Sequence, residues 1–142
     1  MNYGISQLSI VPMRDDPSDK SEMINQILFG EHFKILEARK KWSRIRLAHD
    51  SYEGWICNKQ VLEISEDDYK QLDKDISTIT TDILDIIKKD QHQPIVIGSI
   101  LPFYKSGHAN INSEMYEFNG LTTPGFVKKQ KLVENALIFL KA

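Results

Sequence analysis

Few residues in this sequence have the types and spacing of a catalytic or metal-binding site. Cys57 is the single thiol, and it follows Gly54-Trp55-Ile56 in a predicted strand, rather than a helix N-terminus that would stabilise a thiolate. The histidines are His32, His49, His92 and His108. No two of them lie three or four residues apart, as metal ligands on one helix would. The sequence therefore predicts no catalytic residue, no cofactor and no metal site.

A carboxylate and a phenol form a more informative pair. Glu22 lies where a polar loop, predicted over Arg14–Ser21, meets the next strand, and Tyr52 lies at the tip of a later turn. Side chains of this kind facing one cleft would suit an ammonium group, because the carboxylate accepts a charge-assisted hydrogen bond and the phenol offers its ring or hydroxyl. Further candidates for the wall of this cleft are Asp15, Asp16 and Trp55.

Composition and charge exclude several classes of function. The chain has 142 residues, of which 41% are hydrophobic and 27% charged, as in ordinary globular proteins. Its net charge of -2 disfavours nucleic acid and anionic membranes as partners. The basic clusters Arg39–Lys41 and Lys128–Lys131 are interpreted as a hairpin turn and a solvated helix face. No apolar run approaches the roughly 20 residues of a membrane span.

The N-terminus lacks the basic and then apolar pattern of a secretory signal. The chain as written is therefore predicted to be cytoplasmic, or to lie in the cell envelope if a leader precedes it.

The first half of the chain alternates between apolar and polar residues, with short polar turns between the alternating runs. This period of two is typical of antiparallel strands with one face exposed to water. The predicted strands are Tyr3–Met13, Met23–Phe29, Phe33–Ala38, Trp42–Leu47, Gly54–Cys57 and Val61–Ile64. Such short strands must curl to cover their edges, so residues 1–64 are predicted to form a small barrel.

A helix is predicted over residues 65–75, as a linker to a second barrel. Ser65 is a hydroxyl N-cap, and acidic residues follow it in the first turn. The next segment, Ile76–Lys89, combines a helical spacing of isoleucines with a content of isoleucine and threonine that favours a strand. The residues alone leave helix and strand open, and the family resemblance described below favours a strand.

The second barrel is predicted over residues 76–125. Its expected elements are a turn at Asp90–Gln93, a strand at Pro94–Gly98, alternation over Ala109–Phe118, a turn at Asn119-Gly120 and a loop at Thr122–Gly125. Residues 126–142 are predicted to form an amphipathic helix. Its apolar face consists of Leu132, Val133, Ala136, Leu137 and Leu140.

Three stretches of the first half resemble a bacterial SH3 (SH3b) domain. They are Leu28-Phe29-Gly30-Glu31, Trp42 with Ile45-Arg46-Leu47, and Tyr52-Glu53-Gly54-Trp55-Ile56. With Ser21-Glu22-Met23, they resemble the first SH3b domain of tandem-SH3b, NlpC-type cell-wall cysteine peptidases. The resemblance implies a mainly β fold of two small SH3b-like barrels joined by a short helix, the second barrel degenerate, with a C-terminal helix.

In those peptidases the first SH3b domain lines the substrate groove and helps to select stem peptides with a free N-terminal L-alanine. The resemblance implies this role for Glu22 and Tyr52. The family's catalytic D-C-S-G motif and histidines do not occur in this sequence. The chain alone is therefore expected to be a non-catalytic targeting or substrate-gating module. Its expected partner is a peptidoglycan stem peptide or an NlpC-type catalytic domain.

Two other classes of function remain open from the sequence. One is a stand-alone SH3-like module that binds a protein or peptide, against which the modest aromatic content of 9% argues. The other is an enzyme that uses Cys57. Labelling of the folded protein with a thiol reagent would test this second possibility.

Overall fold

The computed structural model describes residues 2–125, so the predicted C-terminal helix lies outside the described residues. The chain divides into two compact units, Met1–Asp75 and a second that begins at Ile76. The described residues form a mainly β structure with short antiparallel strands, one α-helix and one 3-10 helix, which confirms the predicted fold class.

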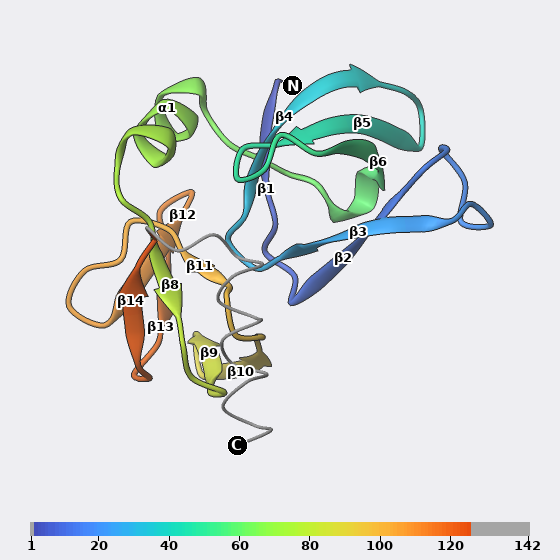
Figure 1. The fold of residues 1–142 in the computed structure, drawn as a ribbon. Helices are drawn as coiled ribbons and strands as arrows, with labels where there is room; N and C mark the ends of the chain where they lie inside the picture. The colour runs from blue at the N-terminus through green and yellow to red at the C-terminus, as the bar shows by residue number, and fades with distance from the viewer. Residues whose placement is uncertain (1, 126–142) are drawn as a thin grey trace. The chain divides into compact units, whose positions relative to one another are not determined.

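The first unit is one antiparallel sheet that curls on itself (Figure 1). Its strands are β1 (Tyr3–Ile5), β2 (Ile10–Arg14), β3 (Met23–Leu28), β4 (His32–Ala38), β5 (Trp42–Leu47), β6 (Glu53–Cys57) and β7 (Leu62–Glu63). Their order in the sheet is β3-β2-β6-β5-β4-β1-β7. The 3-10 helix η1 (Asn58–Gln60) connects β6 to β7. The strands predicted by alternation from β3 to β7 are confirmed.

The single strand predicted over Tyr3–Met13 is wrong, because two strands occupy this segment. The chain bends after β1, where the Ser6 hydroxyl donates to the Leu8 carbonyl at 3.1 Å. Ser6 also exchanges backbone hydrogen bonds with the turn before β4: its N–H donates to Glu31, and its carbonyl accepts from Gly30. As a result β1 pairs with β4 and β7, whereas β2 pairs with β3 and β6.

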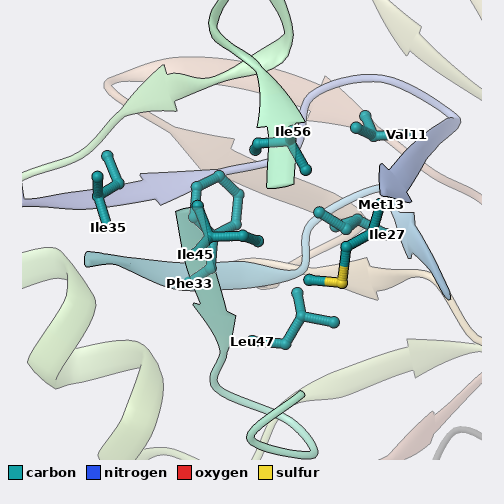
Figure 2. Packing of buried hydrophobic residues seen from close by; sticks show 8 residues of the cluster. All are labelled: Val11, Met13, Ile27, Phe33, Ile35, Ile45, Leu47 and Ile56. Atoms are coloured by element: carbon teal, nitrogen blue, oxygen red, sulfur yellow. The ribbon is translucent and has the colours of Figure 1, made fainter. Parts of the chain in front are cut away.

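The core of the first unit consists of the inward-facing residues of five strands. They are Val11, Met13, Ile27, Phe33, Ile35, Ile45, Leu47 and Ile56, all buried (Figure 2). Ile45 faces Ile35 on β4 and Gly54 on β6. Gly54 admits close packing, since a Cβ atom there would lie 2.6 Å from Cγ of Met13. From the sequence we predict Trp42 in this core with Ile45, Leu47 and Ile56, but Trp42 is half-buried at the outer face.

Helix α1 (Glu66–Lys74) forms as predicted, with the Ser65 hydroxyl accepting from the backbone N–H of Asp68 at 3.1 Å. The helix packs on β1 and β4. Tyr69 stacks on Tyr3 with 4.4 Å between ring centroids. The buried His32 ring meets Tyr69 edge-on, and its Nε2 lies 2.8 Å from Asp73 Oδ1. The helix is therefore part of the first unit.

Two pKa shifts arise on this helix. Burial, and then the nearby Asp73 carboxylate, raise the pKa of the Tyr69 phenol above its ordinary value. A hydrogen bond to Glu66, one turn earlier, raises the pKa of the Lys70 amine. The first shift is the more informative one, because it reflects the docking of the helix on the sheet.

The second unit contains two small antiparallel sheets. Its strands are β8 (Thr78–Thr80), β9 (Asp85–Lys88), β10 (Gln91–Pro94), β11 (Ile100–Leu101), β12 (His108–Ile111), β13 (Glu114–Glu117) and β14 (Thr122–Pro124). The sheet orders are β10-β9-β13-β12 and β11-β8-β14. Buried side chains include Ile79, Ile86, Leu101, Ile111, Tyr116 and Phe118.

Several local predictions for this unit need correction. Ile76–Lys89 forms two strands rather than one, because the chain turns between them around Asp82, whose carboxylate accepts from the N–H groups of Ile83 and Leu121. The turn predicted at Asp90–Gln93 comes one residue earlier, at Lys89 and Asp90, which both have positive φ.

The strand predicted at Pro94–Gly98 is also wrong. β10 ends at Pro94, and the chain then turns at Gly98 with φ of 94°. The loop predicted over Thr122–Gly125 is wrong too, since Thr122–Pro124 pairs with β8. Pro124 is tolerated because β14 is an edge strand that pairs, among the strands of residues 2–125, with β8 alone.

Candidate ligand-binding site

The loop between β2 and β3 carries three of the predicted site residues and has an ordered backbone. At its neck the N–H of Asp15 donates to the carbonyl of Glu22 at 3.0 Å. The next N–H, of Asp16, donates to the Ser21 hydroxyl at 2.9 Å. The Arg14 guanidinium donates to the Ser21 carbonyl at 3.2 Å. These contacts place Asp15, Asp16 and Glu22 at the base of the loop, where all three residues are exposed to solvent.

Trp55 lies on β6 beside this loop, because Arg14 is its backbone partner on β2. Alternation along β6 turns Gly54 and Ile56 inward, so that Trp55 points to the outer face of the sheet. The residue as a whole is nevertheless only 9% exposed. The Arg39 guanidinium covers it, with its central carbon 4.5 Å from the ring centroid. Stacking of this kind stabilises both groups.

Tyr52 occupies a different part of the first unit. Its carbonyl accepts from the N–H of Leu47 and its N–H donates to the Asp50 carboxylate, which shapes the turn between β5 and β6. The ring is 43% exposed. No hydrogen bond or ion pair among the described residues joins Tyr52 to Glu22, and in Figure 1 their loops project from different sides of the unit. The structure thus brings Asp15, Asp16, Glu22 and Trp55 into one neighbourhood and leaves Tyr52 apart from it.

The outer face of β4, β5 and β6 also carries charged residues that sequence reasoning did not select. Glu53 accepts from Arg44 at 2.7 Å and from Arg46 at 3.0 Å. Glu37 accepts from Arg39 at 3.0 Å. The signal for this face was present in the sequence, because Arg44 and Arg46 alternate with Ile45 and must point away from the core.

A shallow cleft of about 200 Å³ continues this face beyond Trp55. Its lining consists of Pro12, Arg14, Asp19, Trp42, Cys57, Lys59 and Gln60. Cys57, opposite Trp42 across the β5–β6 pair, is half-buried at the cleft wall. A cleft this small accepts a single side chain rather than a whole small-molecule ligand, since ligand pockets usually measure about 300–1,000 Å³.

Across residues 2–125, no three histidine, cysteine or acidic side chains gather in a group that could hold a metal ion. The same residues include no helix with the length and apolar character that crossing a bilayer requires.

Comparisons with known proteins agree with this architecture. Residues 13–61 match the sequence profile of the bacterial dipeptidyl-peptidase SH3 domain. The matched segment begins in β2, ends just after η1, and contains every predicted site residue. No curated protein sequence matches the chain.

The fold is similar to a solved structure, the crystal structure of an NlpC/P60 family protein from Bacillus cereus. The superposition has a TM-score of 0.66 at 10% sequence identity and covers 85% of this chain. The chain spans about half of that protein, since the match covers 55% of its length. At this identity the similarity establishes the fold.

Proposed function

We propose that this chain is a non-catalytic module that recognises cell-wall stem peptides for an NlpC-type peptidoglycan hydrolase, because residues 13–61 match the sequence profile of a bacterial SH3 domain. The module would hold or gate the peptide, and hydrolysis would belong to an NlpC-type catalytic domain. The recognised group would be the free amine of an N-terminal L-alanine. Glu22 would accept from this ammonium group, with Asp15 and Asp16 beside it.

The observation that carries this proposal is the ordered base of the β2–β3 loop. Backbone and hydroxyl contacts already fix Asp15, Asp16 and Ser21 there, so a ligand would order little additional chain. Three exposed acidic residues border the base of this loop and favour a cation, and an ammonium group can donate three hydrogen bonds. Trp55 lies beside the loop, beneath the Arg39 guanidinium.

Tyr52 enters the proposal as a second, separable contact. It is exposed and belongs to the matched SH3 segment. Because it lies apart from the loop, it would contact a more distant part of the peptide rather than share one ammonium with Glu22. Single variants of the two residues therefore test two different contacts.

Binding by this chain alone should be weak. One charge-assisted hydrogen bond contributes roughly 1.5–3 kcal/mol, whereas millimolar affinity requires about 4 kcal/mol. We expect a dissociation constant in the millimolar range or above, with the missing free energy supplied by a catalytic domain that forms the opposite wall of the groove.

The test is an NMR titration of the full chain with L-Ala-D-Glu and with its N-acetylated form. We expect shifts of the amides around Glu22 and Asp15 with the free amine alone, and their loss in Glu22→Gln. The matched control is Asp90→Asn, which removes one exposed carboxylate from the second unit and should change nothing. Equal shifts with both peptides, or shifts confined to the second unit, would contradict the proposal.

A stand-alone peptide-binding module is the second candidate function, and the cleft beside Trp42 and Pro12 favours it. A peptide side chain would insert between these two residues. In that case an acetylated peptide would shift the Trp42 indole and Cys57 signals, and Trp42→Ala would abolish those shifts without affecting the β2–β3 loop.

A further inference from the structure

Cations gather on one outer face of the first unit, although the whole chain has a net charge of -2. Strand pairing creates two rows across the sheet. Lys34 on β4 is opposite Arg46 on β5, which is opposite Glu53 on β6. Directly opposite residues share a face, so these three side chains lie together.

The second row lies next to the first. Glu37 on β4 is opposite Arg44 on β5, which is opposite Trp55 on β6, and Trp55 is opposite Arg14 on β2. Arg39 reaches over Trp55 from the turn before β5. We call this surface the arginine face. It comprises Arg14, Lys34, Arg39, Arg44 and Arg46, with Glu37, Glu53 and Trp55.

The acids on this face do not neutralise it. Glu37 and Glu53 are its two carboxylates, and Glu53 is shared between two arginines. The arginine side chains remain accessible, with Arg44 49% and Arg46 45% exposed. Lys34 faces Arg46 across the strand pair, a like-charge arrangement that is unfavourable unless an anion relieves it. The face therefore has a surplus of cations positioned for carboxylates.

The surroundings of the face restrict what can bind there. The β2–β3 loop on one side contains Asp15, Asp16 and Asp19, and helix α1, packed at the β1–β4 end, begins with Glu66-Asp67-Asp68. These acidic flanks would repel a long polyanion that extended past the face, such as a nucleic acid, and would also repel an anionic membrane. A short acidic segment can lie on the arginines without reaching either flank.

We propose that the arginine face binds a short acidic peptide segment of a protein partner. The segment lies along β5, with its carboxylates on Arg44, Arg46 and Lys34. Guanidinium groups suit this ligand because they bind carboxylates through paired hydrogen bonds. The Arg39–Trp55 pair adds a flat surface at one end of the face. This binding is independent of the free amine recognised at the β2–β3 loop.

The experiment measures fluorescence anisotropy of a labelled hexaglutamate peptide, acetylated and amidated at its ends, with the full chain. We expect saturable binding at an ionic strength of about 0.02 M that is lost near 0.5 M. NMR shifts should map to β5 and β6. A hexaglutamine peptide should not bind, because it lacks the charge.

Two pairs of variants separate the arginine face from net charge. The double variant Arg44→Gln/Arg46→Gln should weaken binding about tenfold, whereas Lys89→Gln/Lys105→Gln, which removes two exposed cations from the second unit, should leave it unchanged. Glu53→Gln releases both arginines from their carboxylate and should tighten binding. Glu114→Gln, which releases Lys88 and Lys89 in the second unit, should have no effect.

Several results would overturn the proposal. The two double variants could weaken binding equally, which would mean that the peptide follows net charge alone. Glu53→Gln could leave binding unchanged or weaken it. A hexathymidine oligonucleotide or vesicles containing phosphatidylglycerol could bind more tightly than hexaglutamate, which would assign the face to nucleic acid or to membrane. Absence of any hexaglutamate binding at low salt would also refute it.

Discussion

Replacing Ile45 with alanine should remove a large part of the stability of the first unit. Ile45 is fully buried, and it lies between Ile35 of β4 and Gly54 of β6. Gly54 has no side chain that could move into the space, so the cavity should persist. Truncation of a buried isoleucine to alanine costs about 2–5 kcal/mol of stability. We expect a value in the upper half of this range, because the surrounding residues cannot easily fill the cavity.

The free energy lost in Ile45→Ala is large relative to the total stability of the first unit. A unit of 75 residues is expected to have a total stability of about 4–11 kcal/mol. A loss of about 4 kcal/mol would lower the melting temperature by roughly 16–32 °C, at about 4–8 °C per kcal/mol for a unit of this size.

Tryptophan fluorescence in a urea titration is a suitable assay, because both tryptophans, Trp42 and Trp55, belong to the first unit. The matched control is Ile10→Ala, since Ile10 is 44% exposed at the start of β2 and should lose less than about 1 kcal/mol. A change below about 0.5 kcal/mol for Ile45→Ala would refute the register of β5, because a shift by one residue exposes the whole apolar set.

Three further predictions follow from other parts of the chain. Gly54→Ala should destabilise the first unit by about 1–3 kcal/mol, because the new methyl would meet Met13; an unchanged urea midpoint would contradict the close approach of β2 and β6. The pKa of Tyr69 is raised in the folded state, so the unfolded chain loses the phenol proton at a lower pH than the folded protein does. The contribution of Tyr69 to stability is therefore complete below about pH 10 and declines as the pH rises further. The free energy of unfolding, measured between pH 8 and 11, should decline less steeply with pH for Tyr69→Phe than for the unchanged protein. Identical slopes would argue against burial of the phenol. Incubation with L-Ala-γ-D-Glu-diamino-acid peptides should give no cleavage by mass spectrometry, and cleavage that disappeared in Cys57→Ser would reverse the proposed non-catalytic role.

Local patterns in the sequence were sufficient for most elements of the first unit. Alternation around Ile45 identified β4 to β6 and the direction of their side chains, except for Trp42. The Ser65 cap identified the start of α1. Both signals depend on residues close in the sequence, where backbone geometry and hydrogen bonding act directly. The same alternation predicted that Arg44 and Arg46 lie on the outer face, but it did not predict that both would pair with Glu53.

Other features were decided by contacts between distant residues. The division of Tyr3–Met13 into two strands depends on Ser6 meeting the turn at Gly30 and Glu31. The strand at Thr122–Pro124 exists because β8, more than forty residues earlier, offers an unpaired edge. Neither segment has a local pattern strong enough to predict its pairing.

Sequence patterns were thus sufficient to predict a mainly β protein, a segment similar to a bacterial SH3 domain, and a loop bordered by Asp15, Asp16 and Glu22. Tertiary structure alone decided that α1 docks on the first unit through His32 and Asp73, and that Arg39 covers Trp55. It also decided that Tyr52 stands apart from the loop acids. The physical reason is that periodicity specifies which face of a strand is buried, whereas the neighbours of that strand depend on long-range pairing.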